Sequence, residues 1–387
     1  MDLNYSPEQL MLKESAARFL SEVSSFEFRR QIIASEAGMD EEVWRGFAEL
    51  GWLALPFAEE NGGLGCGPVE ISLLMEEMGK ALVTEPFLAS VVLAGGLLER
   101  VGSAEQRERV LTPLIAGMSR PALAHMERET GSDLGCIATQ AVRDGNGYRL
   151  YGRKALVLGG ASSDTFLVTA RLDNEIALFL LPAGAEGLAR KTVRLVDGSR
   201  ACDLMLDSVR VDEQDLVSAR GGVLPEIEAA YDRATAALAA DAVGCMDALL
   251  AATITYTKQR VQFGQPLANF QALQHRMAEM AVKCEEARAS ALLATLSVDA
   301  PRTIRIRAVS GAKAKVGRAS RHVAQEAIQL HGAMGYSEEM PVGSWFRRLY
   351  AFENSFGSTA EHLARYGAIV RDPAVLAGGL LREPEAY

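Results

Sequence analysis

Histidine and cysteine side chains could hold a metal ion or act as nucleophiles, and this sequence has five of each. The histidines lie far apart along the chain, at His125, His275, His322, His331 and His362. The cysteines are equally scattered and form no C-x-x-C pair; they are Cys66, Cys136, Cys202, Cys245 and Cys284. This spacing supports neither a metal centre nor a disulfide framework, and it fits a reducing cytoplasm.

Sequence signatures of common nucleotide-binding and hydrolytic sites are absent. No G-x-G-x-x-G follows a strand and opens a helix, and there is no G-x-x-x-x-G-K-S/T. The sequence therefore gives little support for a classical dinucleotide-binding fold or a P-loop. H-E-x-x-H and G-x-S-x-G are also missing. The basic residues between Arg302 and Arg321 could form a phosphate-binding face, or instead a solvated face or a subunit contact.

The elements that must position any site begin with helices. Ser6-Pro7-Glu8-Gln9 combines an N-cap serine, a proline at the first helical position and a capping-box glutamine. Ser103 opens a second capping box, and its helix is expected to end before Pro113. Asp40 is expected to cap a short helix that stops at Gly51.

The pattern changes to short strands near Pro121. Asp144-Gly145-Asn146-Gly147 predicts a hairpin between Thr139–Arg143 and Tyr148–Tyr151. Further strands are expected at Ala155–Leu158, Phe166–Thr169, Ile176–Leu181 and Leu204–Val211. Strands at this spacing predict a compact antiparallel barrel or sandwich.

Long helical segments follow from about Val223. They are expected at Leu224–Tyr256, Leu267–Leu296, Pro301–Leu330 and around Glu353–Val370. Their length and alanine-rich faces predict a bundle. The chain is therefore expected to be an α+β protein with an N-terminal helical domain (1–120), a central β-domain (121–222) and a C-terminal helical bundle (223–387).

The bulk composition argues against some classes of function. The chain has 387 residues and a net charge of −10, which argues against nucleic acid as a main partner. The most apolar stretch, Ala234–Tyr256, is interrupted by Asp241 and Asp247, so we expect a buried core helix and no membrane insertion. The N-terminus has no signal-peptide pattern, and a soluble cytoplasmic protein is predicted.

Several motifs in a fixed order carry a family resemblance. The most specific are Arg260-Val261-Gln262-Phe263-Gly264 followed by Phe270-Gln271, and the segment 329–336, which reads Gln-Leu-His-Gly-Ala-Met-Gly-Tyr. The middle region adds Glu127, Gly131-Ser132-Asp133-Leu134 and the segment 150–154. With these motifs the whole chain resembles the FAD-dependent acyl-CoA dehydrogenase family. The resemblance implies an N-terminal helical domain, a central β-domain and a C-terminal four-helix bundle that usually builds a tetramer.

The resemblance implies FAD as the cofactor. In this family FAD lies between two subunits, and the C-terminal domain of one holds the adenine and diphosphate end of the other's FAD. A guanidinium suits a diphosphate, amides can hydrogen-bond, and glycine lets a backbone approach closely. The residues implied to bind FAD are Arg260, Phe263, Gln271, Gln329, Gly332 and Ser358.

The usual catalytic base is missing. The family removes the α-proton of an acyl-CoA with a glutamate just before a C-terminal Gly-Thr, and Phe356 stands there in this chain. A minority of members carry the base on the first helix of the C-terminal domain, where this chain has Ala234. Glu353 and Asp241 are candidates for a relocated base, although a surface or buried-pair role explains either carboxylate as well.

The expected contacts to the flavin ring are also altered. Met126 replaces a threonine, and Leu156 and Leu158 stand where a tryptophan and a hydroxyl residue usually face the ring. Apolar side chains cannot donate the hydrogen bonds that those positions normally provide.

Some features of acyl-CoA binding persist. Ser132 matches a serine that contacts CoA in relatives, and Tyr231-Asp232 resembles a Phe-Asp pair near the pantetheine, although Thr235 stands where an arginine usually follows. Because several helices build such an apolar pocket, the acyl group stays open, and dicarboxylic and steroid side-chain thioesters are both compatible.

The residues that differ from the family are those that would contact this chain's own flavin ring or act as its base. The residues that would contact a neighbour's FAD are kept. We therefore hypothesise a helper subunit that lacks the base, in a heteromeric acyl-CoA dehydrogenase with a homologous catalytic subunit, similar to the small subunits of bacterial pimeloyl-CoA-type enzymes. A heterotetramer is expected, with a homotetramer as the alternative. Alternative functions are a flavin-dependent monooxygenase on the same fold and an assembly subunit that binds no flavin.

Overall fold

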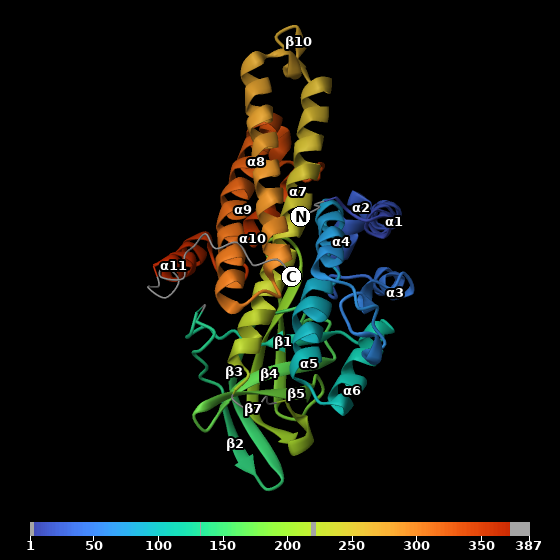
Figure 1. Cartoon of the computed structure of the whole chain (residues 1–387). Coiled ribbons are helices and arrows are strands. Elements are labelled where there is room, and N and C mark those ends of the chain that lie inside the picture. Colours follow the sequence, from blue (N-terminus) through green and yellow to red (C-terminus); the bar gives the residue numbers. More distant parts are fainter. Residues whose placement is uncertain (1–3, 132, 218–221, 372–387) are drawn as a thin grey trace.

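The computed structural model describes residues 4–131, 133–217 and 222–371. Figure 1 shows three parts: a group of short helices, a β-sheet at one end of the molecule, and long helices that project away from the sheet. The predicted order of helices, strands and helix bundle is confirmed.

The N-terminal part consists mainly of short helices. They are α1 (Pro7–Val23), α2 (Phe26–Ala34), α3 (Glu41–Glu49), α4 (Pro68–Ala81), α5 (Gly96–Val101) and α6 (Ala104–Ile115), with the 3-10 turns η1 (Trp52–Ala54) and η2 (Glu59–Asn61) and the π-helical segment η3 (Leu88–Gly95). Both predicted capping boxes are confirmed, at Ser6 in α1 and at Ser103 in α6. The prediction that α6 ends before Pro113 is wrong. Because this proline lies in the last turn, its missing N–H removes one hydrogen bond only, and the helix stops two residues later.

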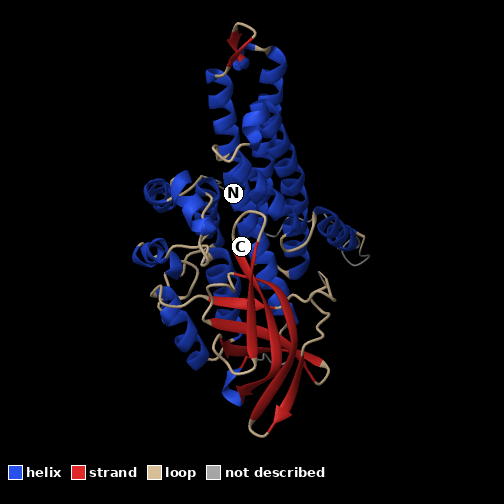
Figure 2. Ribbon diagram, turned by 180° about the vertical axis from the view of Figure 1, so that it is seen from behind, coloured by secondary structure: helices blue, strands red, loops and turns tan. Residues whose placement is uncertain are grey.

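The central part is one eight-stranded sheet with the order β6-β7-β3-β2-β4-β5-β8, and β1 pairs with β4 beside this path. The strands are β1 (Pro121–Ala124), β2 (Gln140–Asp144), β3 (Gly147–Leu158), β4 (Thr165–Leu172), β5 (Glu175–Pro182), β6 (Leu188–Arg194), β7 (Arg200–Asp212) and β8 (Leu216–Val217), and the short turn η4 (Glu213–Asp215) precedes β8. Figure 2 shows this sheet below the projecting helices, with the N-terminal helices along one side.

The sheet is mixed rather than antiparallel. The β2–β3 hairpin is confirmed, but β4 runs parallel to both β1 and β2. A parallel pair needs a long connection, and the chain between β1 and β4 contains the whole β2–β3 hairpin, so hairpin signals alone could not predict this pairing.

The C-terminal part is built around α7 (Leu224–Gln259), α8 (Gln271–Ser297) and α9 (Arg302–His331). Between α7 and α8 a small hairpin, β9 (Val261–Gln262) and β10 (Gln265–Pro266), leads into the turn η5 (Leu267–Asn269). This hairpin lies at the tip of the bundle, far from the sheet (Figure 1). Helix α7 is long and apolar enough to cross a membrane by length and composition, but 67% of its most apolar window is buried inside the protein.

The predicted fourth helix around Glu353–Val370 is wrong, because the structure divides this region into two helices. After the turn η6 (Gly332–Tyr336), α10 (Val342–Asn354) ends, and α11 (Thr359–Val370) begins only after four non-helical residues. Gly357 has a positive φ of 102°, and the Ser358 hydroxyl caps the new helix. We call residues 355–358 the 355–358 loop.

A buried set of charges joins the three parts. We call Arg29 (α2), Asp197 (the turn after β6), Asp241 (α7) and Arg348 (α10) the central ion cluster. Arg348 donates to both oxygens of Asp241, at 3.0 and 2.8 Å, and to the carboxylate of Asp197 at 3.0 Å. Arg29 donates to the backbone carbonyl of Asp197 at 2.8 Å, and burial is the main cause that lowers the pKa of Arg29 to about 10.

Candidate functional site

A cavity of about 820 Å³ lies where the β-sheet meets the C-terminal helices. Met126 follows β1, and Leu158 ends β3, so both belong to the wall on the sheet side. Tyr231 of α7 and Phe356 of the 355–358 loop line it from the helical side. The fold thus brings together residues that are far apart in the sequence, and most of them are apolar.

A β-bulge aims Leu156 into this cavity. The register between β3 and β7 shifts between Lys154 and Val157, and Leu156 has a positive φ of 51°. Its N–H donates to the carboxylate of Asp203 at 3.0 Å, and Arg128 donates to the other oxygen of that carboxylate at 2.7 Å. The backbone donor at this position is therefore already used inside the chain.

The 355–358 loop is fixed by contacts that do not involve the side chain of Phe356. The buried ammonium of Lys313 donates to the carbonyls of Phe352 (2.7 Å) and Gly357 (2.8 Å), and burial lowers its pKa to about 8. The imidazole Nε2 of His362 lies 2.9 Å from the carbonyl of Phe356. These contacts hold Phe356 at a positive φ of 56°, and its ring meets the edge of Tyr231 at 5.4 Å.

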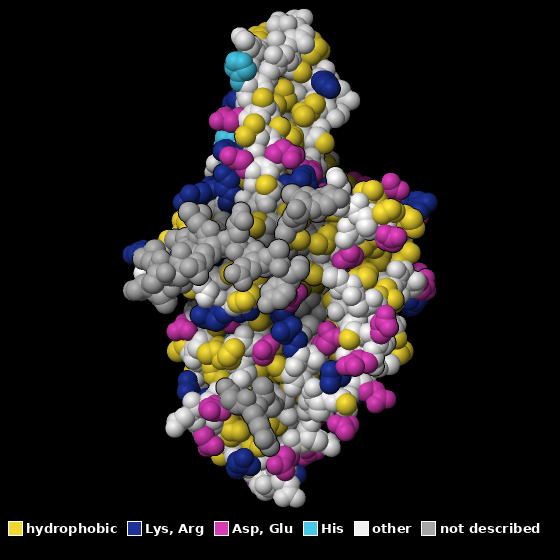
Figure 3. Space-filling model, viewed as in Figure 1, with side chains coloured by type: hydrophobic (Ala, Val, Ile, Leu, Met, Phe, Trp, Pro, Cys, Tyr) yellow, Lys and Arg dark blue, Asp and Glu magenta, His cyan; other side chains and the backbone are white. Residues whose placement is uncertain are grey.

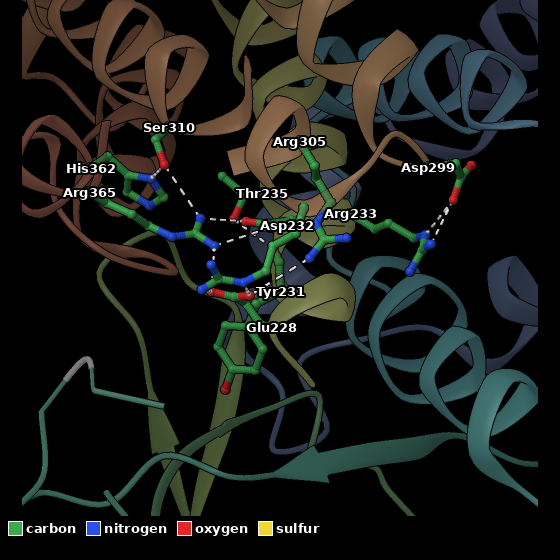
Figure 4. Close-up of polar contacts among 11 residues, drawn as sticks. Glu228, Tyr231, Asp232, Arg233, Thr235, Asp299, Arg305, Ser310, His362 and Arg365 are labelled. Carbon is green, nitrogen blue, oxygen red and sulfur yellow. Dashed lines mark hydrogen bonds and ion pairs between the residues drawn. The ribbon is translucent and has the colours of Figure 1, made fainter. Parts of the chain in front are cut away.

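Arginines and carboxylates form a network beside the cavity, and Figure 4 labels four of its members, Glu228, Asp232, Arg305 and Arg365. We call Glu228, Asp232, Arg302, Arg305 and Arg365 the arginine–carboxylate network. Arg305 donates to Asp232 at 2.9 Å and Arg365 donates to the same carboxylate at 3.1 Å. Arg302 forms a bidentate pair with Glu228, at 2.6 and 2.8 Å. Arg302 and Arg305, from the basic segment of the sequence, therefore contact groups of this chain.

A second buried ion pair lies beneath the cavity, and no sequence pattern predicted it. The ammonium of Lys154 donates to Glu127 at 2.7 Å and to the hydroxyl of Thr169 at 3.1 Å, and both charged side chains are fully buried. Nδ1 of His125 lies 3.1 Å from the same hydroxyl, and the ring of His125 packs against that of Tyr231 at 5.6 Å. This network supports the wall that carries Met126.

The burial of His125 predicts sensitivity to acid. Burial and, secondarily, the charge of Lys154 lower the pKa of His125 from 6.5 to about 3. Because the folded state then binds this proton more weakly than the unfolded state, the stability from His125 is complete above pH 6.5 and declines as the pH falls towards 3. Because of His125, the wild-type protein should lose on the order of 4 kcal/mol of unfolding free energy across this pH range. In urea titrations, we expect His125→Gln to lack this loss.

The matched control is His275→Gln, which alters an exposed histidine on α8. It should leave the slope of unfolding free energy against pH unchanged. Identical slopes for His125→Gln and the wild-type protein would contradict a buried neutral imidazole.

Five of the residues implied to bind FAD gather at the opposite end of the molecule. Arg260 and Phe263 lie in the hairpin region after α7, Gln271 begins α8, and Gln329 and Gly332 lie at the end of α9. The stacking of Tyr256 on His331, at 4.4 Å, joins the ends of α7 and α9 there. We call this group the tip cluster; Figure 3 shows hydrophobic side chains along this projecting end.

The tip cluster cannot reach the cavity of its own chain. Tyr231 and Arg260 are separated by most of the 36-residue helix α7, which is about 40 Å at 1.5 Å per residue. The Phe263 side chain is 90% exposed, and Arg260 has no side-chain partner among the described residues. Gly332 adopts φ 58° and ψ −136°, a backbone conformation that only glycine takes without strain.

Comparisons with known proteins cover most of this chain. Models of the acyl-CoA dehydrogenase N-terminal, middle and C-terminal domains match residues 6–118, 122–209 and 227–368. The probable acyl-CoA dehydrogenase YngJ of Bacillus subtilis is 30% identical over 370 residues, which are 93% of this chain and 97% of the relative. This chain belongs to the acyl-CoA dehydrogenase family.

Solved structures of the family share the whole fold. The ChsE4-ChsE5 complex from Mycobacterium tuberculosis is similar with a TM-score of 0.87 and 28% identity, over 96% of this chain and 99% of that chain. Butyryl-CoA dehydrogenase from Megasphaera elsdenii is similar with a TM-score of 0.88 and 26% identity, over 96% of this chain and 100% of that chain. The predicted membership of the acyl-CoA dehydrogenase family is thereby confirmed.

Acyl-CoA dehydrogenases are flavoproteins, so the residues of this chain can be tested for their fit to FAD. Around the cavity, Met126, Leu156 and Leu158 carry no hydrogen-bond donor, and the N–H of Leu156 is occupied by Asp203. These residues do not fit the polar edge of a flavin ring. The tip cluster does fit the other end of FAD, because it presents an exposed guanidinium, two exposed amides and a glycine backbone.

Carboxylates near the cavity are engaged by other groups. Asp241 belongs to the central ion cluster, Glu353 accepts hydrogen bonds from the N–H (3.2 Å) and hydroxyl (2.7 Å) of Thr359, and neither lines the cavity. Glu228, which sequence reasoning missed, does line it. Burial raises the pKa of Glu228, but its hydrogen bond to Arg302 and the charge of Arg365 bring the pKa below the ordinary value, which makes this carboxylate a weak base.

The remaining predicted residues have different surroundings. Ala234 is buried in the core, and Asp232 is fully engaged by Arg305 and Arg365. Ser358 lies in the 355–358 loop, apart from the tip cluster, and its hydroxyl accepts the N–H of Glu361. Ser132 lies outside the described residues.

Proposed function

We propose that this chain is the helper subunit of a heteromeric, FAD-dependent acyl-CoA dehydrogenase, and that it completes the FAD site of a homologous catalytic subunit. The observation that carries the proposal is the separation of two regions within one chain. The tip cluster keeps groups that suit the diphosphate end of FAD, whereas the cavity has Phe356 at the expected position of the base and leucines at those of the ring contacts.

Each subunit would have its own part in α,β-dehydrogenation of an acyl-CoA. FAD, when bound, supplies the acceptor for the β-hydride. In this chain, the guanidinium of Arg260 would bind the diphosphate, and Gln271 and Gln329 would donate hydrogen bonds to the same end of FAD. The general base would come from the partner. We place this complex in the cytoplasm, in keeping with the scattered cysteines and acidic composition.

The ChsE4-ChsE5 complex supports the proposal, because that relative is an assembly of two differently named chains. The similarity extends over 96% of this chain, so the tip cluster and the cavity both fall within a fold that is able to form a mixed complex. We do not assign the substrate of that complex to this chain, and the proposed reaction does not specify the acyl group.

The test is the amount of FAD bound per chain. We would purify the chain alone and after co-expression with a homologue that keeps the C-terminal glutamate, and measure flavin by absorbance after denaturation. We expect almost no FAD in the chain alone and about one FAD per pair in the complex, because only the partner supplies a ring site. A full complement of FAD in the chain alone, bleached by an acyl-CoA, would overturn the proposal. Co-purification of the two chains without FAD would identify an assembly subunit instead.

A further inference from the structure

A second cavity lies between the N-terminal helices and the C-terminal bundle. Its volume is about 210 Å³, and it shares no lining residue with the larger cavity described above. Its wall is formed by the loop before α4, the start of α4, η3, α5, α7 and the end of α8. None of the residues that we assign to FAD, to acyl-CoA or to the base lines it. We call it the second cavity.

The helical periodicity of α7 directs Arg233 to this second cavity. Arg233, Ala236 and Ala237 all line it, and residues three and four positions apart lie on one face of a helix. Tyr231 and Asp232 lie on another face of α7 and line the larger cavity. Figure 4 shows the side chain of Arg233 directed away from the arginine–carboxylate network and towards Asp299.

One amino group of Arg233 has no hydrogen-bond partner. Its Nε and Nη2 both donate to the same carboxylate oxygen of Asp299, at 3.2 and 2.6 Å. Its Nη1 is buried, and no acceptor lies within hydrogen-bond distance of it among the residues that the structure describes. Because nearly all buried polar groups in proteins are paired, an unpaired guanidinium nitrogen in the wall of a cavity indicates that a ligand supplies the acceptor.

The charges around the second cavity favour an uncharged ligand. The charge of Arg233 is balanced by its carboxylate partner, and Arg100 donates to Glu226 at 2.9 Å. Glu99 accepts a hydrogen bond from the N–H of Ala58 at 2.7 Å, and its negative charge also belongs to the wall. An anion would therefore lose its hydration without meeting an unpaired cation, and a cation could not accept the hydrogen bond from Nη1.

The size and the remaining walls fit a small molecule with an apolar body. Ile71, Val92, Ala237 and Val298 supply apolar surface around the space next to Arg233. A cavity of about 150 Å³ is already large enough for benzene, so one ring or a short branched chain fits into this one.

We propose that the second cavity binds a small uncharged molecule, and that a carbonyl or other acceptor oxygen of this molecule receives a hydrogen bond from Nη1 of Arg233. The ligand binds and does not react. The inference is independent of the proposed function, because the site requires neither FAD nor a partner subunit.

The test uses two probes of the same shape, cyclohexanone and methylenecyclohexane, in which a methylene group replaces the carbonyl oxygen. The reporters are the methyl NMR signals of Ile71, Val92 and Val298 in the full-length chain, because these residues line the second cavity and not the larger one. We expect saturable shifts of these signals with both probes. Cyclohexanone should bind about 10-fold more tightly, which corresponds to one hydrogen bond from a charged donor.

Arg233→Met should abolish the preference for cyclohexanone and leave the affinity for methylenecyclohexane within about twofold of the wild-type value. The side chain of Asp299 is 59% exposed, so water can replace its lost partner and the fold should be kept. The matched control is Arg45→Met, which alters an exposed arginine on α3 outside both cavities and should keep the preference.

A second variant, Gly96→Leu, fills the second cavity and should abolish binding of both probes. Gly96 has helical backbone angles, φ −63° and ψ −33°. Outside the neighbouring helical backbone, a Cβ added there would meet only the carbonyl oxygen of Val91, at 3.8 Å, so the chain can accept a side chain at this position.

Several outcomes would overturn the inference. Equal affinity of the two probes for the wild-type chain, or an unchanged preference in Arg233→Met, would show that Nη1 does not bind the oxygen. Tighter binding of cyclohexanecarboxylate than of cyclohexanone would contradict an uncharged ligand. Unshifted methyl signals with all three probes would mean that the cavity holds water only. None of these results affects the amount of FAD bound per chain, so the proposed function is tested separately.

Discussion

Arg260→Ala in the assembled complex is expected to weaken FAD binding by about 10- to 100-fold. The guanidinium of Arg260 has no partner among the residues that the structure describes, and it lies at the end of α7, about 40 Å from the cavity. A hydrogen bond to a charged group contributes about 1.5–3 kcal/mol, and each 1.4 kcal/mol is a factor of ten. We would measure the dissociation constant of FAD after reconstitution of the apo-complex, together with its dehydrogenase activity.

The matched control for this experiment is Arg210→Ala. Arg210 is also an exposed arginine, but it lies on β7, and its nearest carboxylate is that of Asp212 at 3.8 Å. This variant should bind FAD as the wild-type complex does. If Arg260→Ala and Arg210→Ala bind FAD equally well, the tip cluster is not a FAD site.

Arg348→Ala is expected to lower the free energy of unfolding by about 3–5 kcal/mol. The substitution leaves Asp241, whose side chain is only 2% exposed, and Asp197 without their shared cation. Removing one partner of a buried ion pair lowers the free energy of unfolding by more than the intact pair contributes, because the remaining charge stays buried and unpaired. The shift in the urea midpoint of unfolding, converted with the slope of the transition, measures this loss.

Arg45→Ala controls for the loss of an arginine as such. Arg45 pairs with Glu42 on the exposed face of α3, and such a surface pair contributes little. The Arg348 variant should therefore unfold at a clearly lower urea concentration than the Arg45 variant. Similar midpoints would show that the central ion cluster does not join the three parts energetically.

Local chemistry made much of the fold predictable from the sequence. The capping boxes at Ser6 and Ser103 act over three residues, so a short pattern determines where α1 and α6 begin. The hairpin signal Asp144-Gly145-Asn146-Gly147 is equally local, and β2 and β3 pair as expected. Parallel pairing of β1 with β4 depends on contacts between distant segments, and no local pattern encodes it.

The candidate site was predictable in its residue types but not in its contacts. The apolar positions Met126, Leu156 and Leu158 were recognised from the order of motifs, and they line one cavity. The engagement of Asp232 by two arginines was missed, because Arg305 and Arg365 come from other helices. The neutral environment of His125 was missed for the same reason, since burial among β1, β3 and β4 gives no signal in a single sequence.

The contacts of the 355–358 loop have an evolutionary consequence. Lys313 and His362 contact the backbone carbonyls of Phe352, Phe356 and Gly357, so part of what holds this loop is contact to the main chain and is the same for any side chain at position 356. The residue at position 356 can therefore change in one substitution while these contacts to the main chain are kept.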